Sequence, residues 1–429
     1  MKPVCLCLLL IVCATKLQAE EFSFDIASYS KSPYELGGYA EFSAINTQLN
    51  TSSALSNLLP ATINSDSNNQ YTTGLQLEGL YRFSNSQFFM QFYAENQNSD
   101  VLASQHDTLF NEIYYTDSHL YKLNIEIGKR VQKWGKGYAW SPVGFIERKK
   151  DPNDPELSRE GYYMLSADYV RSFQGNLKTL AIMPVYLPVT ESINNDFSTG
   201  VDNNGENNNF AGRVYFLYRD IDFDVVFLSK GSKSARLGVD FSSNVSTNFE
   251  VHGEYAYIFD ETLSYLSPAN QLIERQKDVK LSLLGVRYLT SSEITWIAEY
   301  YHNGSGYTQA QLETFFNLLE SDFTVTPQLL TLAQQASQSG YGKVNPGKDY
   351  LYLSGIQKEP FNWVYLNIGF NSIVNLHDKS YSITPEVSYS GYKNTEIRLR
   401  ASFLQGDQLT EFGEKLNQKK LEFRLRYYF

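Results

Sequence analysis

One stretch of this acidic sequence concentrates positive charge. Residues 129–150 hold seven basic residues and one acidic residue, whereas the whole chain carries a formal net charge of −11. The basic residues and the tryptophans among them are Lys129, Arg130, Lys133, Trp134, Lys136, Trp140, Arg148, Lys149 and Lys150. Cations gathered around a narrow opening favour the passage of anions. We predict that these residues form a positively charged pore constriction; the equal alternative is a surface loop whose cations meet the phosphates of lipopolysaccharide.

A second basic group follows from the two-residue period of extended chain. Four arginines near the C-terminus occupy alternate positions of two neighbouring runs, and they are Arg398, Arg400, Arg424 and Arg426. Side chains at alternate positions share one face of a strand. We predict that they line an inner wall as a ladder across adjacent strands. The favoured alternative is ordinary wall electrostatics, in which the arginines pair with Glu386, Glu396 and Glu422.

The residues that could support catalysis or metal binding are scattered. The five histidines are His106, His119, His252, His302 and His377. His252, between Glu250 and Glu254, could imitate a hydrolase pair, and so could His302 with Glu299, yet no serine stands beside either as a nucleophile. The oxygen-rich stretch 202–206 lacks a complete calcium-loop pattern. We therefore expect no catalytic residue, no metal and no cofactor.

The end of the chain indicates which elements position these groups. In residues 421–429 the odd positions are all apolar and the even positions are mostly charged. A strand with this pattern that ends in a free aromatic residue, Phe429, has one face for lipid and one for water. It is typical of the closing strand of a transmembrane β-barrel.

The composition and the spacing of the connections between alternating runs extend this pattern to most of the chain. The sequence is 15% aromatic, with 32 Tyr and 27 Phe, yet its mean hydropathy is only −0.36. Tyr and Phe suit a lipid-facing band, and polar residues suit an inner wall and loops. We count about 18 alternating runs, joined by alternately short and long connections. The sequence predicts an all-β fold, a transmembrane antiparallel β-barrel of about 18 strands with long extracellular loops over residues 36–429. A soluble β-sandwich is the disfavoured alternative.

The N-terminus has the features of a secretory signal. Lys2 precedes an apolar core at 4–14, and Leu17-Gln18-Ala19 precedes Glu20. We expect residues 1–19 to be cleaved and residues 20–35 to form a periplasmic segment. Cleavage would remove all three cysteines, at positions 5, 7 and 13, so no disulfide or cysteine-held metal is expected.

Signal and barrel together predict a location in the bacterial outer membrane. The expected partners are outer-membrane lipid, lipopolysaccharide, the barrel assembly machinery and a hydrophilic or anionic solute. The acidic net charge disfavours nucleic acid as a partner.

The connection at 303–348 differs from the others because it contains helix signals. Thr308 to Gln311 form a capping box, and a stripe at helical spacing follows, composed of Leu312, Phe315, Phe316 and Leu319. Thr326-Pro327 opens a second run. We predict a helical hairpin over 308–337. It is either a lid or plug of the barrel or, as the sequence favours, a surface loop that buries its own apolar stripe.

The basic stretch also resembles a known family. Trp-Gly-Lys-Gly at 134–137, Ser-Pro at 141–142 and Asp-Pro-Asn-Asp-Pro at 151–155 are similar to the arrangement in porin-like outer-membrane barrels loosely grouped with the alginate-export family. The resemblance is confined to this stretch. It implies an eighteen-stranded barrel with a basic lumen that passes anionic polysaccharide or other hydrophilic solutes.

These observations favour a porin-like channel without enzymatic activity. The alternative is a structural barrel that anchors or sheathes a surface polysaccharide or a periplasmic partner. An outer-membrane hydrolase is the disfavoured third possibility.

Overall fold

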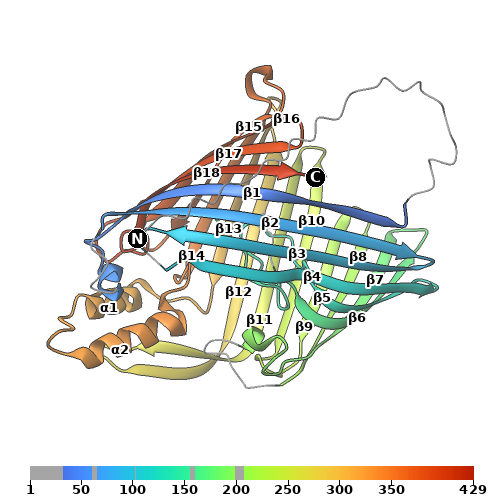
Figure 1. Ribbon diagram of the computed structural model, residues 1–429. Helices are drawn as coiled ribbons and strands as arrows, with labels where there is room; N and C mark the ends of the chain where they lie inside the picture. The colour runs from blue at the N-terminus through green and yellow to red at the C-terminus, as the bar shows by residue number, and fades with distance from the viewer. Residues whose placement is uncertain (1–31, 60–64, 102, 155–159, 199–206) are drawn as a thin grey trace. The chain divides into compact units, whose positions relative to one another are not determined.

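The strands of the chain close into one barrel. The computed structural model describes residues 32–59, 65–101, 103–154, 160–198 and 207–429, so the predicted signal at 1–19 lies outside the described residues. Residues 34–429 form one compact unit. Its 18 strands are antiparallel, each pairs with the next along the chain, and the last pairs with the first (Figure 1). The predicted all-β barrel of 18 strands is confirmed.

The bounds of the elements follow in chain order. The strands are β1 Tyr34–Leu49, β2 Ser67–Phe83, β3 Ser86–Ser99, β4 Gln105–Leu120, β5 Leu123–Arg130, β6 Tyr162–Ser172, β7 Leu177–Leu187, β8 Asn209–Tyr218, β9 Ile221–Leu228, β10 Arg236–Ser246, β11 Phe249–Leu266, β12 Leu272–Leu289, β13 Ile294–Asn303, β14 Asp349–Lys358, β15 Leu366–Asn375, β16 Tyr381–Tyr392, β17 Thr395–Gln405 and β18 Asn417–Tyr428. The helices are α1 Gln309–Leu319 and α2 Pro327–Ala336, and the short helical turns are η2 Ala54–Leu58, η3 Asn195–Ser198, η4 Ser337–Tyr341 and η5 Pro360–Asn362.

The alternation of side chains along the strands separates an outer from an inner face. Leu237 of β10 lies opposite Tyr257 of β11, and Val239 lies opposite Tyr255. Leu237 and Tyr255 are exposed, while Asp240 and Glu254, on the other face of the same strands, are buried. An apolar outer face and a polar inner face are what a lipid-embedded barrel requires.

Strands β11 and β12 extend into residues 260–277, where alternation of side chains does not indicate strands. After an irregularity between Ile258 and Glu261, β11 and β12 continue to pair as far as Leu266 and Leu272. Leu266 is buried there among the residues of α1, so tertiary packing supports strand structure that alternation alone did not indicate.

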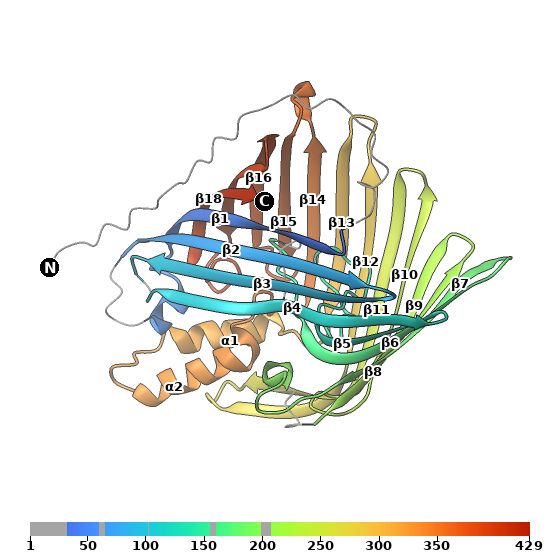
Figure 2. The same cartoon turned by 45° about the vertical axis from the view of Figure 1, so that its right-hand side comes forward.

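The predicted helical hairpin is confirmed. Thr308 and Gln311 form the reciprocal capping box, and Pro327 opens α2. The predicted stripe of α1, from Leu312 to Leu319, is buried. Figures 1 and 2 show α1 and α2, in orange, at the end of the barrel opposite the β14–β15 turn. No described helix is long and apolar enough to cross a membrane.

The last residue extends the pairing of β1 with β18 that closes the barrel. The Phe429 N–H donates to the Gly38 carbonyl (3.1 Å), and the Gly38 N–H donates to the Phe429 carbonyl (3.2 Å). We predict that deletion of Phe429 lowers the yield of folded barrel, because it removes both bonds and the exposed ring. The measurement is the fraction that shows heat-modifiable migration on gels. F429A separates the ring from the main-chain bonds, and a normal yield of the deletion variant would contradict the prediction.

Candidate functional site

The stretch between β5 and β6 crosses the inside of the barrel. It leaves the wall beside β4, where the Val131 N–H donates to the Glu112 carboxylate (2.9 Å). It then contacts the inner faces of β11, β13 and β17 through Glu254, Glu299 and Arg400. We call residues 131–154 the crossing segment. Irregular main chain at this depth needs internal hydrogen-bond partners, because neither lipid nor a regular strand supplies them.

Glu254 of β11 supplies the first set of acceptors. Its Oε1 accepts from the N–H groups of Lys136 and Gly137 (both 2.6 Å), and its Oε2 accepts from the Val143 N–H (3.1 Å). The glycines of the Trp-Gly-Lys-Gly motif allow this approach. Gly135 has φ +89°, and a Cβ there would lie 2.6 Å from the Glu254 Oε1. The motif therefore encodes a main-chain cradle for a buried carboxylate.

Glu299 of β13 supplies the second set. It accepts from the N–H groups of Tyr138 (2.5 Å) and Ala139 (2.9 Å), and it lies 2.9 Å from the Nε2 of His252. The side chains of Glu299 and His252 are fully buried. The sequence suggested both residues only as members of two other pairs that imitate a hydrolase, Glu299 with His302 and His252 with its neighbouring glutamates. In the structure they hold the crossing segment in place.

Asp154 fixes the far end of the crossing segment to the arginine wall. The Nη1 of Arg400 donates to its Oδ2 (2.9 Å), and Arg398 and Arg424 each lie 3.9 Å from the carboxylate. Burial alone would raise the pKa of Asp154, but the hydrogen bond from Arg400 and the charges of the arginines lower it below its usual value. The Asn153 carbonyl accepts from Asn371 of β15 (3.0 Å).

The four predicted wall arginines do face inward on adjacent strands. Arg398 lies opposite Arg424, and Arg426 lies opposite Glu396. Each has acidic neighbours: Arg400 bonds Glu386 (2.6 Å), Arg424 bonds Glu422 (2.6 Å) and Arg426 bonds Glu41 (2.6 Å). The arrangement therefore combines both alternatives, the ladder of arginines and their pairing with acidic residues. Asp154 is a further partner that the sequence pattern does not indicate.

Most of the basic residues of the crossing segment and its flank are neutralised. Lys136 lies 3.0 Å from Asp224 of β9, and Arg148 lies 2.8 Å from Glu160. Lys129 also pairs with Glu160, and Arg130 pairs with Glu126. Lys150 donates to the uncharged Gly137 carbonyl, and its charge acts on Glu254. Two lysines remain: Lys133 and Lys149 are exposed and make no ion pair within the described part of the chain. Buried charges require partners of opposite charge, and for this reason most of the predicted basic residues are paired with acidic side chains.

The two predicted tryptophans pack against the wall instead of facing open space. Trp134 lies among Val143 and Phe145 of the segment and Val226 of β9. Trp140 stacks on Tyr301 of β13, with ring centroids 5.0 Å apart. Both are buried, so they anchor the segment.

The inner wall of β1 to β3 carries half-buried polar side chains outside these contacts. Glu78 of β2 accepts from Gln76 (2.7 Å) and Gln91 (2.8 Å), and Glu95 of β3 accepts from Tyr93 (2.8 Å). Among the described residues, neither glutamate has a cation partner. These side chains form a polar strip of the inner wall.

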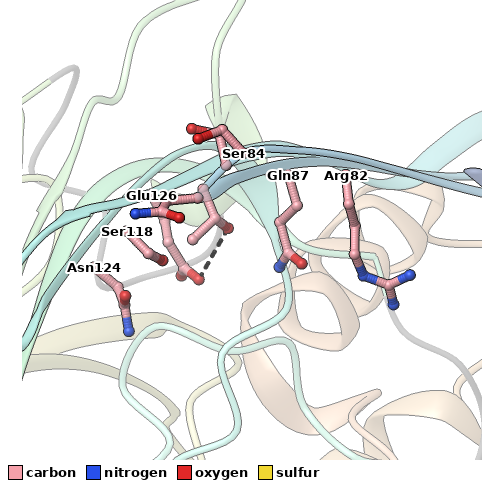
Figure 3. Close-up of a pocket in the computed structure, with 9 residues that line it drawn as sticks. Arg82, Ser84, Gln87, Ser118, Asn124 and Glu126 are labelled. Carbon is pink, nitrogen blue, oxygen red and sulfur yellow. Dashed lines mark hydrogen bonds between the residues drawn. The ribbon is translucent and has the colours of Figure 1, made fainter. Parts of the chain in front are cut away.

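A polar pocket of about 290 Å³ continues this wall at the short-turn end. Figure 3 shows residues that line it, with Arg82 and Gln87 on β2 and β3 and Glu126 on β5. Thr116 donates to Glu126 (3.3 Å), the bond drawn there. No described group of three or more His, Asp or Glu side chains is arranged to hold a metal ion.

The opposite mouth is bridged by an apolar cluster. It joins Ala54 and Leu58 of η2, between β1 and β2, through α1 to Leu266 and Leu272 at the tip of β11 and β12. In the sheet order these two hairpins are separated by β3–β10 on one side and β13–β18 on the other. The Asn57 side chain donates to the Leu319 carbonyl (2.9 Å). The helical hairpin of α1 and α2 therefore contacts both sides of this mouth.

Comparisons with known proteins give a distant likeness. No protein-family model matches the chain, and no curated protein matches its sequence. Among solved structures, a variant of the porin of Rhodopseudomonas blastica is 11% identical with a TM-score of 0.43, and the match covers 92% of this chain and 100% of that chain. A triple variant of that porin is 10% identical, with a TM-score of 0.44 and the same coverage. The strand pairing establishes the barrel independently of this likeness.

A closed antiparallel barrel of this kind is porin-like, is typical of outer-membrane proteins and supports a channel-type function.

The carboxylates of Glu254 and Glu299 generate a prediction. We expect E254A and E299A to loosen the crossing segment while the barrel still folds, because the strand pairing is untouched. Each buried N–H left without an acceptor costs about 1–3 kcal/mol, enough to weaken docking by roughly fivefold or more. Single-channel recording should show higher and noisier conductance.

The control for this prediction is L237A, on the exposed outer face of β10, which should leave the conductance near that of the wild type. E254Q keeps one acceptor oxygen and should be intermediate. If E254A and E299A both keep the wild-type conductance, the two glutamates do not anchor the crossing segment.

Proposed function

We propose that the protein is an outer-membrane channel for hydrophilic, anionic solutes, including anionic polysaccharide. The observation that supports this most is the crossing segment itself, which is basic and is fixed across the lumen of a barrel too wide for wall side chains to fill. In this proposal the passage runs between the segment and the polar strip of β1 to β3.

The charges along this passage have opposite signs. Lys133 and Lys149 supply the positive charge of the segment that is not consumed in ion pairs, while Glu78 and Glu95 supply negative charge on the strip. Anions would be attracted to the lysines, and the glutamates would reduce the preference of the channel for anions over cations. Lys136 and Arg148 do not serve this role, because their charges hold the fold of the segment.

The environment of Lys149 adds a pH dependence. The side chain of Lys149 is exposed to the lumen but enclosed by the barrel, and the resulting desolvation, together with the charges of Lys343 and Arg236, lowers its pKa to about 8, while Glu261 opposes this effect. Lys149 is therefore charged below that pH and loses its charge as the pH rises through it.

We predict that K133Q/K149Q lowers the anion preference measured as a reversal potential in a salt gradient. E78Q/E95Q is the matched control and should shift the potential in the opposite direction. In the wild type, raising the pH from 7 to 9 should lower the anion preference, and K149Q should lose most of this response. A cation-selective pore that does not respond to the lysine substitutions would overturn the proposal of an anion channel, and a barrel that inserts without conducting would favour the structural alternative.

The helical hairpin is proposed to act as a lid on the outer mouth. Its apolar face joins both sides of the mouth, so removing it would open a path that it now spans. We predict that replacing residues 308–337 by a short glycine and serine linker raises conductance without loss of heat-modifiable barrel.

The control for the lid is a substitution on the exposed connection of the hairpin, such as V325S, which leaves the cluster intact. Unchanged conductance in a folded deletion variant would place the hairpin outside the permeation path and make it a surface interaction element.

A further inference from the structure

The turn between β14 and β15 is unlike the other short turns. Its residues 361–365, Phe-Asn-Trp-Val-Tyr, are all exposed, with Phe361 at 92% and Trp363 at 59%. The other short turns at this end are mostly polar, for example Ser84-Asn85, Arg219-Asp220 and Ser291-Ser292. Figure 2 shows the turn, in brown, reaching past its neighbours.

The exposure of these side chains is built into an ordered backbone. Glu359, Phe361, Asn362 and Tyr365 all have positive φ, between 49° and 68°, which is uncommon for residues other than glycine. The main chain is nonetheless bonded within the turn: the Glu359 N–H donates to the Leu366 carbonyl (2.7 Å), and the Trp363 N–H donates to the Pro360 carbonyl (3.1 Å). A strained and well-bonded turn that holds aromatic rings outward points to a partner for those rings.

The turn is continuous with the lipid-facing surface. Trp363 packs edge-on against Tyr389 of β16, with ring centroids 6.0 Å apart, and Tyr389 contacts Tyr392. Val387, two residues before Tyr389 and therefore on the same face of β16, is exposed as part of the outer band. The aromatic row thus begins on the face that meets lipid and reaches Trp363, and the exposed Phe361 lies two residues before it in the same turn.

The chemistry of the turn matches the boundary between acyl chains and headgroups. Trp and Tyr favour that boundary because one end of each ring is apolar and the other can bond to water. Two exposed lysines flank the row, Lys358 before the turn and Lys393 in the adjacent turn, where they can meet anionic headgroups.

We propose that the β14–β15 turn is a lipid anchor that inserts Phe361 and Trp363 into the phospholipid interface at the short-turn end of the barrel. This inference rests on the proposed location of the barrel in a membrane, and it is independent of what the channel conducts.

Cysteine labelling tests the anchor. All three cysteines lie at positions 5, 7 and 13, so a chain that begins at Glu20 and carries F361C has one label site. The protein is folded into vesicles of phosphatidylethanolamine and phosphatidylglycerol and labelled with an environment-sensitive dye. The matched control is T247C, which is exposed on a polar turn at the same end. We expect the dye at 361 to be blue-shifted, quenched by lipids that carry a quencher near the headgroup, and several-fold less accessible to iodide than the dye at 247.

A second variant covers the case in which the label disturbs the turn. F361S/W363S should insert into the same vesicles several-fold more slowly than the wild type, while the folded fraction keeps its conductance. Equal iodide accessibility at 361 and 247, together with an unchanged insertion rate of F361S/W363S, would overturn the anchor and make the turn a docking point for a protein. The channel proposal would stand in that case, because it is judged from conductance and reversal potential alone.

Discussion

Main chain that crosses the inside of a membrane barrel must find hydrogen-bond acceptors there, and the acceptors in this protein are the carboxylates of two buried glutamates. Glu254 and Glu299 together receive five N–H groups of the crossing segment. A neutral side chain would offer fewer acceptor positions and weaker bonds. Because these acceptors lie on β11 and β13, the depth at which the segment crosses is set by two strand positions. In the proposed channel, the same anchoring sets how much space is left between the segment and β1 to β3.

Charge neutralisation is the second constraint, and it explains why a basic segment does not make a uniformly basic pore. A lysine or arginine that is half-buried against the wall needs an acidic partner, and β9 supplies one in Asp224. One acidic side chain of the segment, Asp154, is in turn held by arginines of β17 and β18. Cations of the segment thus pair with acidic residues of the wall, and an acidic residue of the segment pairs with arginines of the wall. Among the described cations of the segment, Lys133 and Lys149 are exposed and make no ion pair, so the proposed channel relies on them for its preference for anions.

The sequence predicts those features that depend on local period. Alternation identifies the strands and their inner and outer faces, and the capping box at Thr308 identifies α1. Period cannot predict which distant side chain meets a loop that folds inward: Arg400 and Asp154 are 246 residues apart. In the sequence, Glu254 and Glu299 stand out only because histidines lie near them. The better signal was the glycine spacing of Trp-Gly-Lys-Gly, since Gly135 leaves no room for a Cβ beside a carboxylate.

The two elements that lie across the barrel are held by different physical chemistry. The crossing segment depends on charged and main-chain hydrogen bonds to the wall, whereas the outer hairpin depends on an apolar cluster that joins Ala54 to Leu266 through α1. Salt or a change of pH acts mainly on the first, and loss of apolar volume acts mainly on the second. The cluster includes neither Glu254 nor Asp154. In the proposed channel, the width of the passage and the cover of its mouth therefore depend on different interactions.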